Sequence, residues 1–116
     1  MVSQVDVRDV ARAHILAMTA PKASNRRIIL VSELLTPQLV VNIIHKHFPD
    51  FGDKVGKGDP SRILPQGVNP NGWNVSRSLD IFGEGWRYTA LEESVRDTVE
   101  SLLRYEDGWN LQAKGT

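Results

Sequence analysis

The stretch VDVRDVARAH, residues 5–14, decides how the chain begins to fold. Its first three residues alternate apolar and acidic side chains, as a short β-strand does, and the apolar residues that follow recur at helical spacing. Asp6 or Asp9 is suited to accept hydrogen bonds from the amides of a first helical turn. The sequence therefore predicts a strand and then an amphipathic helix that ends near Pro21.

A second strand and helix are predicted further along the chain. The segment RIILV at 27–31 is a short apolar run, which is typical of a strand covered on both faces, as in a parallel sheet. Thr36 followed by Pro37 is the pattern of a helix N-cap and first helical position, and apolar residues continue at helical spacing to Phe48. We expect a helix of about three turns there.

Residues 49–74 hold five glycines and four prolines, a density that opposes both helices and sheet ladders. Loops longer than roughly 12–15 residues are uncommon in compact domains and are often functional. We expect a long mobile loop over this range.

Two helices are predicted in the last third of the chain. Ser76 is placed to cap a short helix that Gly83 would end. Thr89 and Glu92 have the spacing of a capping box, and an ion pair between Glu92 and Arg96 is expected on the wet face. The apolar stripe of this last helix consists of Leu91, Val95, Val99, Leu102 and Leu103.

Composition narrows the class of protein. The 116 residues, 41% of them hydrophobic, suffice for one core, so we expect one unit. Basic and acidic residues balance at 14 each, which argues against nucleic acid and membrane surfaces as partners. The chain has no cysteine, which excludes thiolate chemistry, and a cytoplasmic location is expected.

Neither a phosphate-binding loop nor a metal site is predicted. A dinucleotide fold places closely spaced glycines between a strand and a helix, whereas Gly56 and Gly58 lie in the long loop, where we attribute them to loop flexibility. His45 and His47 point about 200° apart on a helix, so they do not converge on one metal ion. His14 falls on the apolar face of the first helix, and we expect it to be a packed core residue.

Catalytic residues are equally hard to place, and we assign none. No Gly-x-Ser-x-Gly nucleophile elbow occurs, so hydrolysis is not supported. Tyr88 and Tyr105 both lack a lysine four positions later.

For substrate binding, the candidates are Arg62 and Trp73, both in the long loop. Trp86 and Trp109 lie beside helix ends, where ordinary packing is the commoner role of a tryptophan.

Several segments resemble the extended short-chain dehydrogenase/reductase family, within the epimerase/dehydratase superfamily, especially its dihydroflavonol-reductase-like and methylglyoxal-reductase-like branch. Residues 5–14 are similar to that family's V-D-V-x-D-V-A-x-A-H segment. The likeness continues through residues 27–30 and 32–33, then through 74–83 and through the closing helix at 91–98. It covers nearly the whole chain.

The resemblance implies an α/β fold: the C-terminal, substrate-side part of an extended Rossmann-type reductase, with about four helices and a few short strands. In such reductases a glycine-rich loop holds NADP(H), and a Ser with Tyr-x-x-x-Lys transfers the proton, all in the N-terminal part. Residues 1–116 would then be a single substrate-binding portion without the dinucleotide-binding domain, and would bind no cofactor alone. The family usually has an aromatic residue where this chain has Gln4, so we expect a truncated gene product, an alternative transcript or an excised piece.

Two functions follow from this interpretation. The first is the substrate-side fragment of an NADPH-dependent aldehyde or ketone reductase, inactive alone. The second is a stand-alone interaction or regulatory module that binds itself or a full-length relative. Either way, the face that a missing domain would cover is expected to drive homo-oligomer formation.

Overall fold

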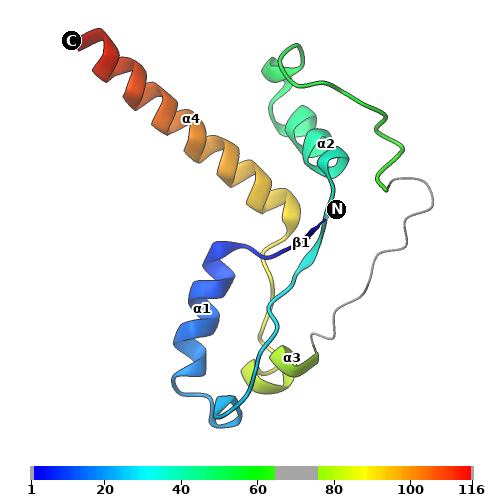
Figure 1. Ribbon diagram of the computed structural model, residues 1–116, viewed down its shortest axis with the longest axis vertical. Helices are drawn as coiled ribbons and strands as arrows, with labels where there is room; N and C mark the ends of the chain where they lie inside the picture. Colours follow the sequence, from blue (N-terminus) through cyan, green and yellow to red (C-terminus); the bar gives the residue numbers. More distant parts are fainter. Residues whose placement is uncertain (1, 65–75, 116) are drawn as a thin grey trace. The chain divides into compact units, whose positions relative to one another are not determined.

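The computed structural model describes residues 2–64 and 76–115 of the chain (Figure 1). Four α-helices and a two-stranded sheet are present among them, which confirms the expected α/β architecture of four helices and a few short strands. The elements, in chain order, are β1 (Val2–Gln4), α1 (Val7–Ala17), the 3-10 turn η1 (Pro21–Ala23), β2 (Glu33–Leu35), α2 (Pro37–His47), the 3-10 turn η2 (Pro49–Phe51), α3 (Ser76–Phe82) and α4 (Leu91–Gly115).

These elements group into two compact units. The first unit contains residues 2–36, 64 and 76–91, and therefore β1, α1, η1, β2 and α3. The second contains residues 37–63 and 92–115, and therefore α2, η2 and nearly all of α4. Each unit is described by itself below. No helix in the described ranges combines the length and apolar character needed to cross a membrane.

The sheet differs from the prediction. β1 pairs antiparallel with β2, with Val2 opposite Leu35 and Gln4 opposite Glu33. The strands predicted at 5–7 and 27–31 were wrong, because residue 7 already begins α1 and residues 26–32 form no ladder with any described segment. A strand exists only where a partner strand lies beside it, and here that partner is at the extreme N-terminal end of the described chain.

Helix α1 begins as predicted but buries another face. Asp6 is its N-cap and accepts a hydrogen bond from the amide of Arg8 at 2.8 Å. The helix ends at Ala17, four residues before Pro21. Its buried positions are Asp9 and Ala13, 2% and 3% exposed.

The stripe of α1 that sequence reasoning placed in the core is largely exposed. His14 is exposed, and its Nδ1 lies 2.7 Å from the carbonyl oxygen of Val10, so the expected core histidine was wrong. Val7, Ile15 and Met18 are 78%, 68% and 84% exposed. At 100° per residue these three project from the same side of the helix, and we call them the α1 apolar face.

The predicted start of α2 and the predicted end of α3 are confirmed, whereas Ser76, the predicted cap of α3, is itself the first residue of that helix. α2 starts at Pro37, directly after the buried Thr36, and spans the expected three turns. α3 ends at Phe82, and Gly83 follows with a φ of 89°, the left-handed conformation that favours glycine at a helix end.

The start of α4 corrects the predicted capping box. The helix begins at Leu91, whose amide donates to Glu33 Oε2 at 3.0 Å, and the hydroxyl of Thr89 donates to Asp9. Glu92 pairs with residues of α2, not with Arg96. Both capping-box side chains are thus engaged by residues distant in sequence, which a local motif does not reveal.

Only part of the predicted long loop can be compared with the structure. Residues 49–51 form η2, and 52–64 contain turns without a strand or α-helix. Residues 65–74 lie outside the described residues.

Candidate functional site

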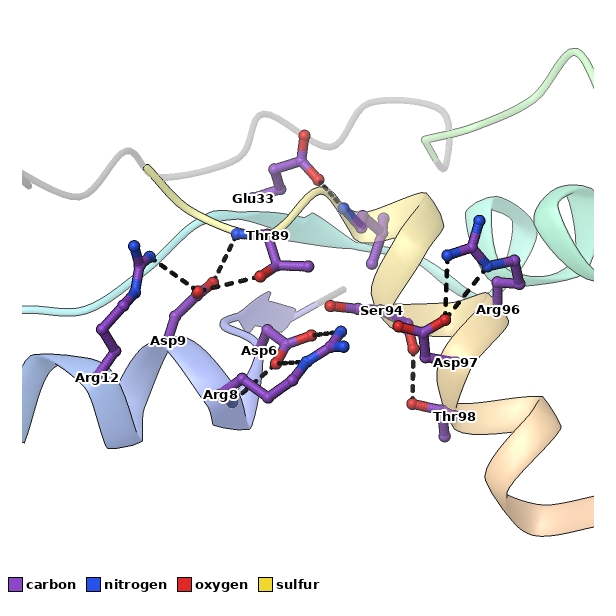
Figure 2. Close-up of polar contacts among 11 residues, drawn as sticks. Asp6, Arg8, Asp9, Arg12, Glu33, Thr89, Ser94, Arg96, Asp97 and Thr98 are labelled. Atoms are coloured by element: carbon purple, nitrogen blue, oxygen red, sulfur yellow. Dashed lines mark hydrogen bonds and ion pairs between the residues drawn. The ribbon is translucent and has the colours of Figure 1, made fainter. Parts of the chain in front are cut away.

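A buried carboxylate joins α1 to the segment before α4. Asp9 Oδ2 accepts a hydrogen bond from the backbone amide of Thr89 at 2.7 Å, and Asp9 Oδ1 accepts one from the Thr89 hydroxyl at 3.0 Å (Figure 2). Arg12 Nη2 donates to the same Oδ1 at 3.1 Å and also to the carbonyl of Arg87. With 2% of its surface exposed, Asp9 is a structural anchor rather than a base available to a ligand.

An aromatic cluster lies beside this anchor. The Trp86 ring is 4.7 Å from that of Phe82 and 5.4 Å from that of Tyr88, and the guanidinium of Arg12 stacks over it at 4.3 Å. Trp86 is 3% exposed, so it fills the core of the first unit, as expected for a tryptophan beside a helix end.

Two further carboxylates of the first unit hold helix starts. Asp6 forms a bidentate ion pair with Arg8, in which Nε donates to Oδ1 at 2.9 Å and Nη2 donates to Oδ2 at 2.7 Å (Figure 2). The backbone amide of Arg8 also donates to Asp6. Glu33 accepts from the amide of Leu91. Negative charge near a helix N-terminus is stabilising, so these acids serve the fold.

In the second unit, one carboxylate oxygen is contacted by two nitrogen atoms of α2. Glu92 Oε1 lies 2.6 Å from Lys46 Nζ and 2.7 Å from His47 Nε2. The hydrogen bonds from Lys46 and then His47 lower the pKa of Glu92 below its ordinary value, and the charge of Lys46 adds to the effect. This cluster ties α4 to α2, a role that the sequence did not reveal because the residues are 45 and 46 positions apart.

One glycine of the long loop, Gly58, has a conformational role. Gly58 has a φ of 60°, and a Cβ added there would collide with the side-chain amide of Gln38. That amide donates to the carbonyl of Lys57 at 3.0 Å and to Asn42 at 2.8 Å. Gly58 therefore allows a close approach to α2, whereas the sequence suggested loop flexibility. No group of three metal-ligating side chains occurs among the described residues.

Of the two substrate-binding candidates, only Arg62 lies within the described residues. Arg62 is exposed, and its amide closes a turn onto the carbonyl of Asp59 at 3.0 Å. Trp73 lies outside the described residues. Trp109, on α4, is 69% exposed.

A pocket of about 650 Å³ lies in the first unit, between the segment 21–26 and α3. Sequence reasoning missed it, because its basic residues come from segments some fifty positions apart and only folding brings them to one place. Its lining includes Lys22, Ser24, Arg26, Arg77, Asp80 and Ile81.

Together, the helices, the short sheet and their connections match the C-terminal part of a Rossmann-type reductase. No family profile matches the sequence. The homologues of the chain are oxidoreductases of the short-chain dehydrogenase/reductase family, which confirms the predicted resemblance.

Two curated relatives and one solved structure illustrate the likeness. An oxidoreductase of Schizosaccharomyces pombe is 36% identical over 101 residues, which are 86% of this chain and 28% of that protein. The NADPH-dependent methylglyoxal reductase GRE2 of Saccharomyces cerevisiae is 26% identical over 102 residues, 88% of this chain and 29% of that protein. A crystal structure of the yeast methylglyoxal/isovaleraldehyde reductase Gre2 complexed with NADPH aligns with a TM-score of 0.81 and 25% identity, over 91% of this chain and 34% of that one. The chain thus spans less than a third of the length of the curated relatives it matches.

Proposed function

We propose that this chain is the substrate-side, C-terminal part of an NADPH-dependent aldehyde or ketone reductase, and that it does not reduce carbonyl compounds by itself. The observation that carries the proposal is the pattern of coverage. Between 84% and 89% of the chain aligns with curated oxidoreductases, two of them NADPH-dependent methylglyoxal reductases by name, while only 26–29% of each relative is covered.

The site geometry agrees with this proposal. The buried acid Asp9 is occupied by structural hydrogen bonds, and so is the N-cap Asp6. Neither Tyr88 nor Tyr105 is followed by the lysine that the family's proton donor requires. A reductase built on this chain therefore needs the nicotinamide site and the proton donor from another polypeptide segment.

The test is a chimeric reductase. The segment of yeast Gre2 that aligns with this chain would be replaced by residues 1–116, and the NADPH oxidation rate would be followed by absorbance with methylglyoxal and isovaleraldehyde. We expect turnover by the chimera and none by this chain alone. Turnover by the isolated chain, or a folded chimera that binds NADPH and reduces neither aldehyde, would refute the proposal.

A second function is favoured by the α1 apolar face. Val7, Ile15 and Met18 expose most of their surface, and covering such side chains contributes roughly 1.5–3 kcal/mol each. We propose that, without the rest of a reductase, a second copy of this chain covers this face, which makes the chain a self-associating module. The same face is available to a full-length relative.

Self-association is tested by light scattering across a tenfold dilution series. Ile15→Asp, on this face, should give a monomer, whereas Arg104→Asp, an exposed position on α4, should leave the oligomer intact. A wild-type monomer at every concentration would exclude this second function and leave the first untouched.

A further inference from the structure

The pocket between residues 21–26 and α3 collects positive charge. Among the described residues, three basic ones line it, Lys22, Arg26 and Arg77, against one acid, Asp80. The excess of two positive charges contrasts with the whole chain, whose formal net charge is zero. A local excess of this kind, lining a hollow, attracts anions even when the protein as a whole is neutral.

Contacts between the two walls fix the shape of the pocket. Lys22 Nζ lies 3.0 Å from Asp80 Oδ1, so this acid is already paired with one of the cations of the pocket. Arg77 Nη1 donates to the carbonyl oxygen of Arg27 at 3.1 Å, which anchors α3 to the opposite wall. Both walls belong to the first compact unit. The shape of the pocket is therefore independent of how the two units are arranged.

Two guanidinium groups are left for a ligand. The side chain of Arg26 makes no hydrogen bond or ion pair with the rest of the described chain, and Arg77 uses one of its donors on a neutral carbonyl. A guanidinium presents its N–H groups in a planar fork that matches the oxygens of phosphate. Ser24 and Ser76 add polar lining, whereas Pro21 and Ile81 add apolar lining.

We propose that this pocket is a binding site for a phosphate group carried by a small organic molecule. Two unpaired guanidinium charges match the charge of a phosphate monoester, and the apolar wall offers surface to its carbon skeleton. The volume, about 650 Å³, lies within the range typical of small-molecule pockets. This proposal does not depend on the proposed function, because it rests only on the residues that line the pocket.

The first experiment measures binding to the full chain by isothermal titration calorimetry at low salt, with inorganic phosphate, glycerol phosphate and pyrophosphate as separate probes. We expect saturable binding that weakens as salt is added, since the charges at an open pocket are screened. Tightest binding of glycerol phosphate would support a small phosphate monoester as the ligand class, whereas tightest binding of pyrophosphate or of inorganic phosphate would refute the part of the proposal that assigns the apolar wall to a carbon skeleton. Absence of saturable binding by all three probes would overturn the proposal.

The second experiment uses variants. Arg26→Gln removes a guanidinium that supports no intramolecular contact among the described residues, so the fold should survive, as checked by circular dichroism. We expect about tenfold weaker binding. Arg104→Gln, an exposed arginine on α4, is the matched control and should bind as the wild type does. Equal affinity in Arg26→Gln and Arg104→Gln would place the phosphate elsewhere and refute the site. An inactive chimeric reductase would leave both results unaffected.

Discussion

Asp9→Ala offers the most direct test of how the first unit is held together. The carboxylate accepts two hydrogen bonds from Thr89, at 2.7 and 3.0 Å, and is 2% exposed. Hydrogen bonds to a charged group contribute about 1.5–3 kcal/mol each, and the substitution also leaves the Thr89 amide without its acceptor. The ion pair with Arg12 adds little, because that side chain is 44% exposed. We expect a loss of about 3 kcal/mol in the free energy of unfolding.

The loss is measured by urea unfolding, followed by circular dichroism. With a denaturant slope of about 1–3 kcal/mol per molar, the midpoint should fall by roughly 1–3 M. Asp80→Ala is the matched control, because its carboxylate is 64% exposed and pairs with Lys22 at the surface. The control should change stability by less than about 0.5 kcal/mol.

Hydrogen exchange gives an independent measurement at the contact itself. The amide proton of Thr89 is protected by Asp9 Oδ2, so its exchange should accelerate in Asp9→Ala beyond the change in global stability. Thr89→Val keeps the backbone amide and removes the hydroxyl. A double-mutant cycle with Asp9→Ala therefore isolates the hydrogen bond from the Thr89 hydroxyl to Asp9. An unfolding midpoint for Asp9→Ala equal to that of Asp80→Ala would refute the anchoring role.

Three further substitutions test the helix ends and the carboxylate of α4. Gly83→Ala should lower the free energy of unfolding by about 1 kcal/mol, because φ is 89° at this position, although an added Cβ would meet no atom. Gly85→Ala, the control, should be nearly neutral in the same thermal melt. Equal melting temperatures of the two variants would contradict strain at this helix end. Glu33→Ala should cost about 1 kcal/mol in urea unfolding through loss of the acceptor at the start of α4, with Glu33→Gln intermediate, and an unchanged midpoint in both would count against this cap. Because its partners on α2 lower the pKa of Glu92 in the folded chain, the stabilisation by this group is present above the ordinary carboxyl pKa and is lost as pH falls through the lowered one. Urea midpoints of Glu92→Gln and wild type should therefore differ at neutral pH and converge in acid, with Glu93→Gln as control, and a gap that persists at low pH would be inconsistent with this linkage.

The start of α2 and the end of α3 were predictable from the sequence because their signals are local. α2 starts at Pro37, directly after Thr36, and Gly83 ends α3 because it adopts a positive φ at little cost. Each signal acts within a few residues of where it stands in the chain. The structure changed none of these assignments.

The predictions of strands and of capping contacts were wrong where the partner residue is distant in sequence. β2 is set by its register with residues 2–4 at the far end of the described chain, about thirty positions away, so the apolar run at 27–31 carried no information about where a ladder would form. The Thr89 hydroxyl, correctly identified as a hydrogen-bonding group near a helix start, is engaged by Asp9 eighty positions earlier. The pocket around Arg26 and Arg77 was missed for the same reason.

The burial of α1 is the most informative difference. Periodicity gave a helix with an apolar stripe, and both exist, but the unit packs Asp9 and Ala13 inward and leaves Val7, Ile15 and Met18 in water. Periodicity reports which side of a helix is apolar, whereas burial depends on which residues are near enough to cover it. Burial of exposed apolar side chains against another protein surface is favourable, because it removes apolar area from water. The stripe on α1 thus supports association, whether with the rest of a reductase or with a second copy, on physical grounds that do not depend on sequence similarity.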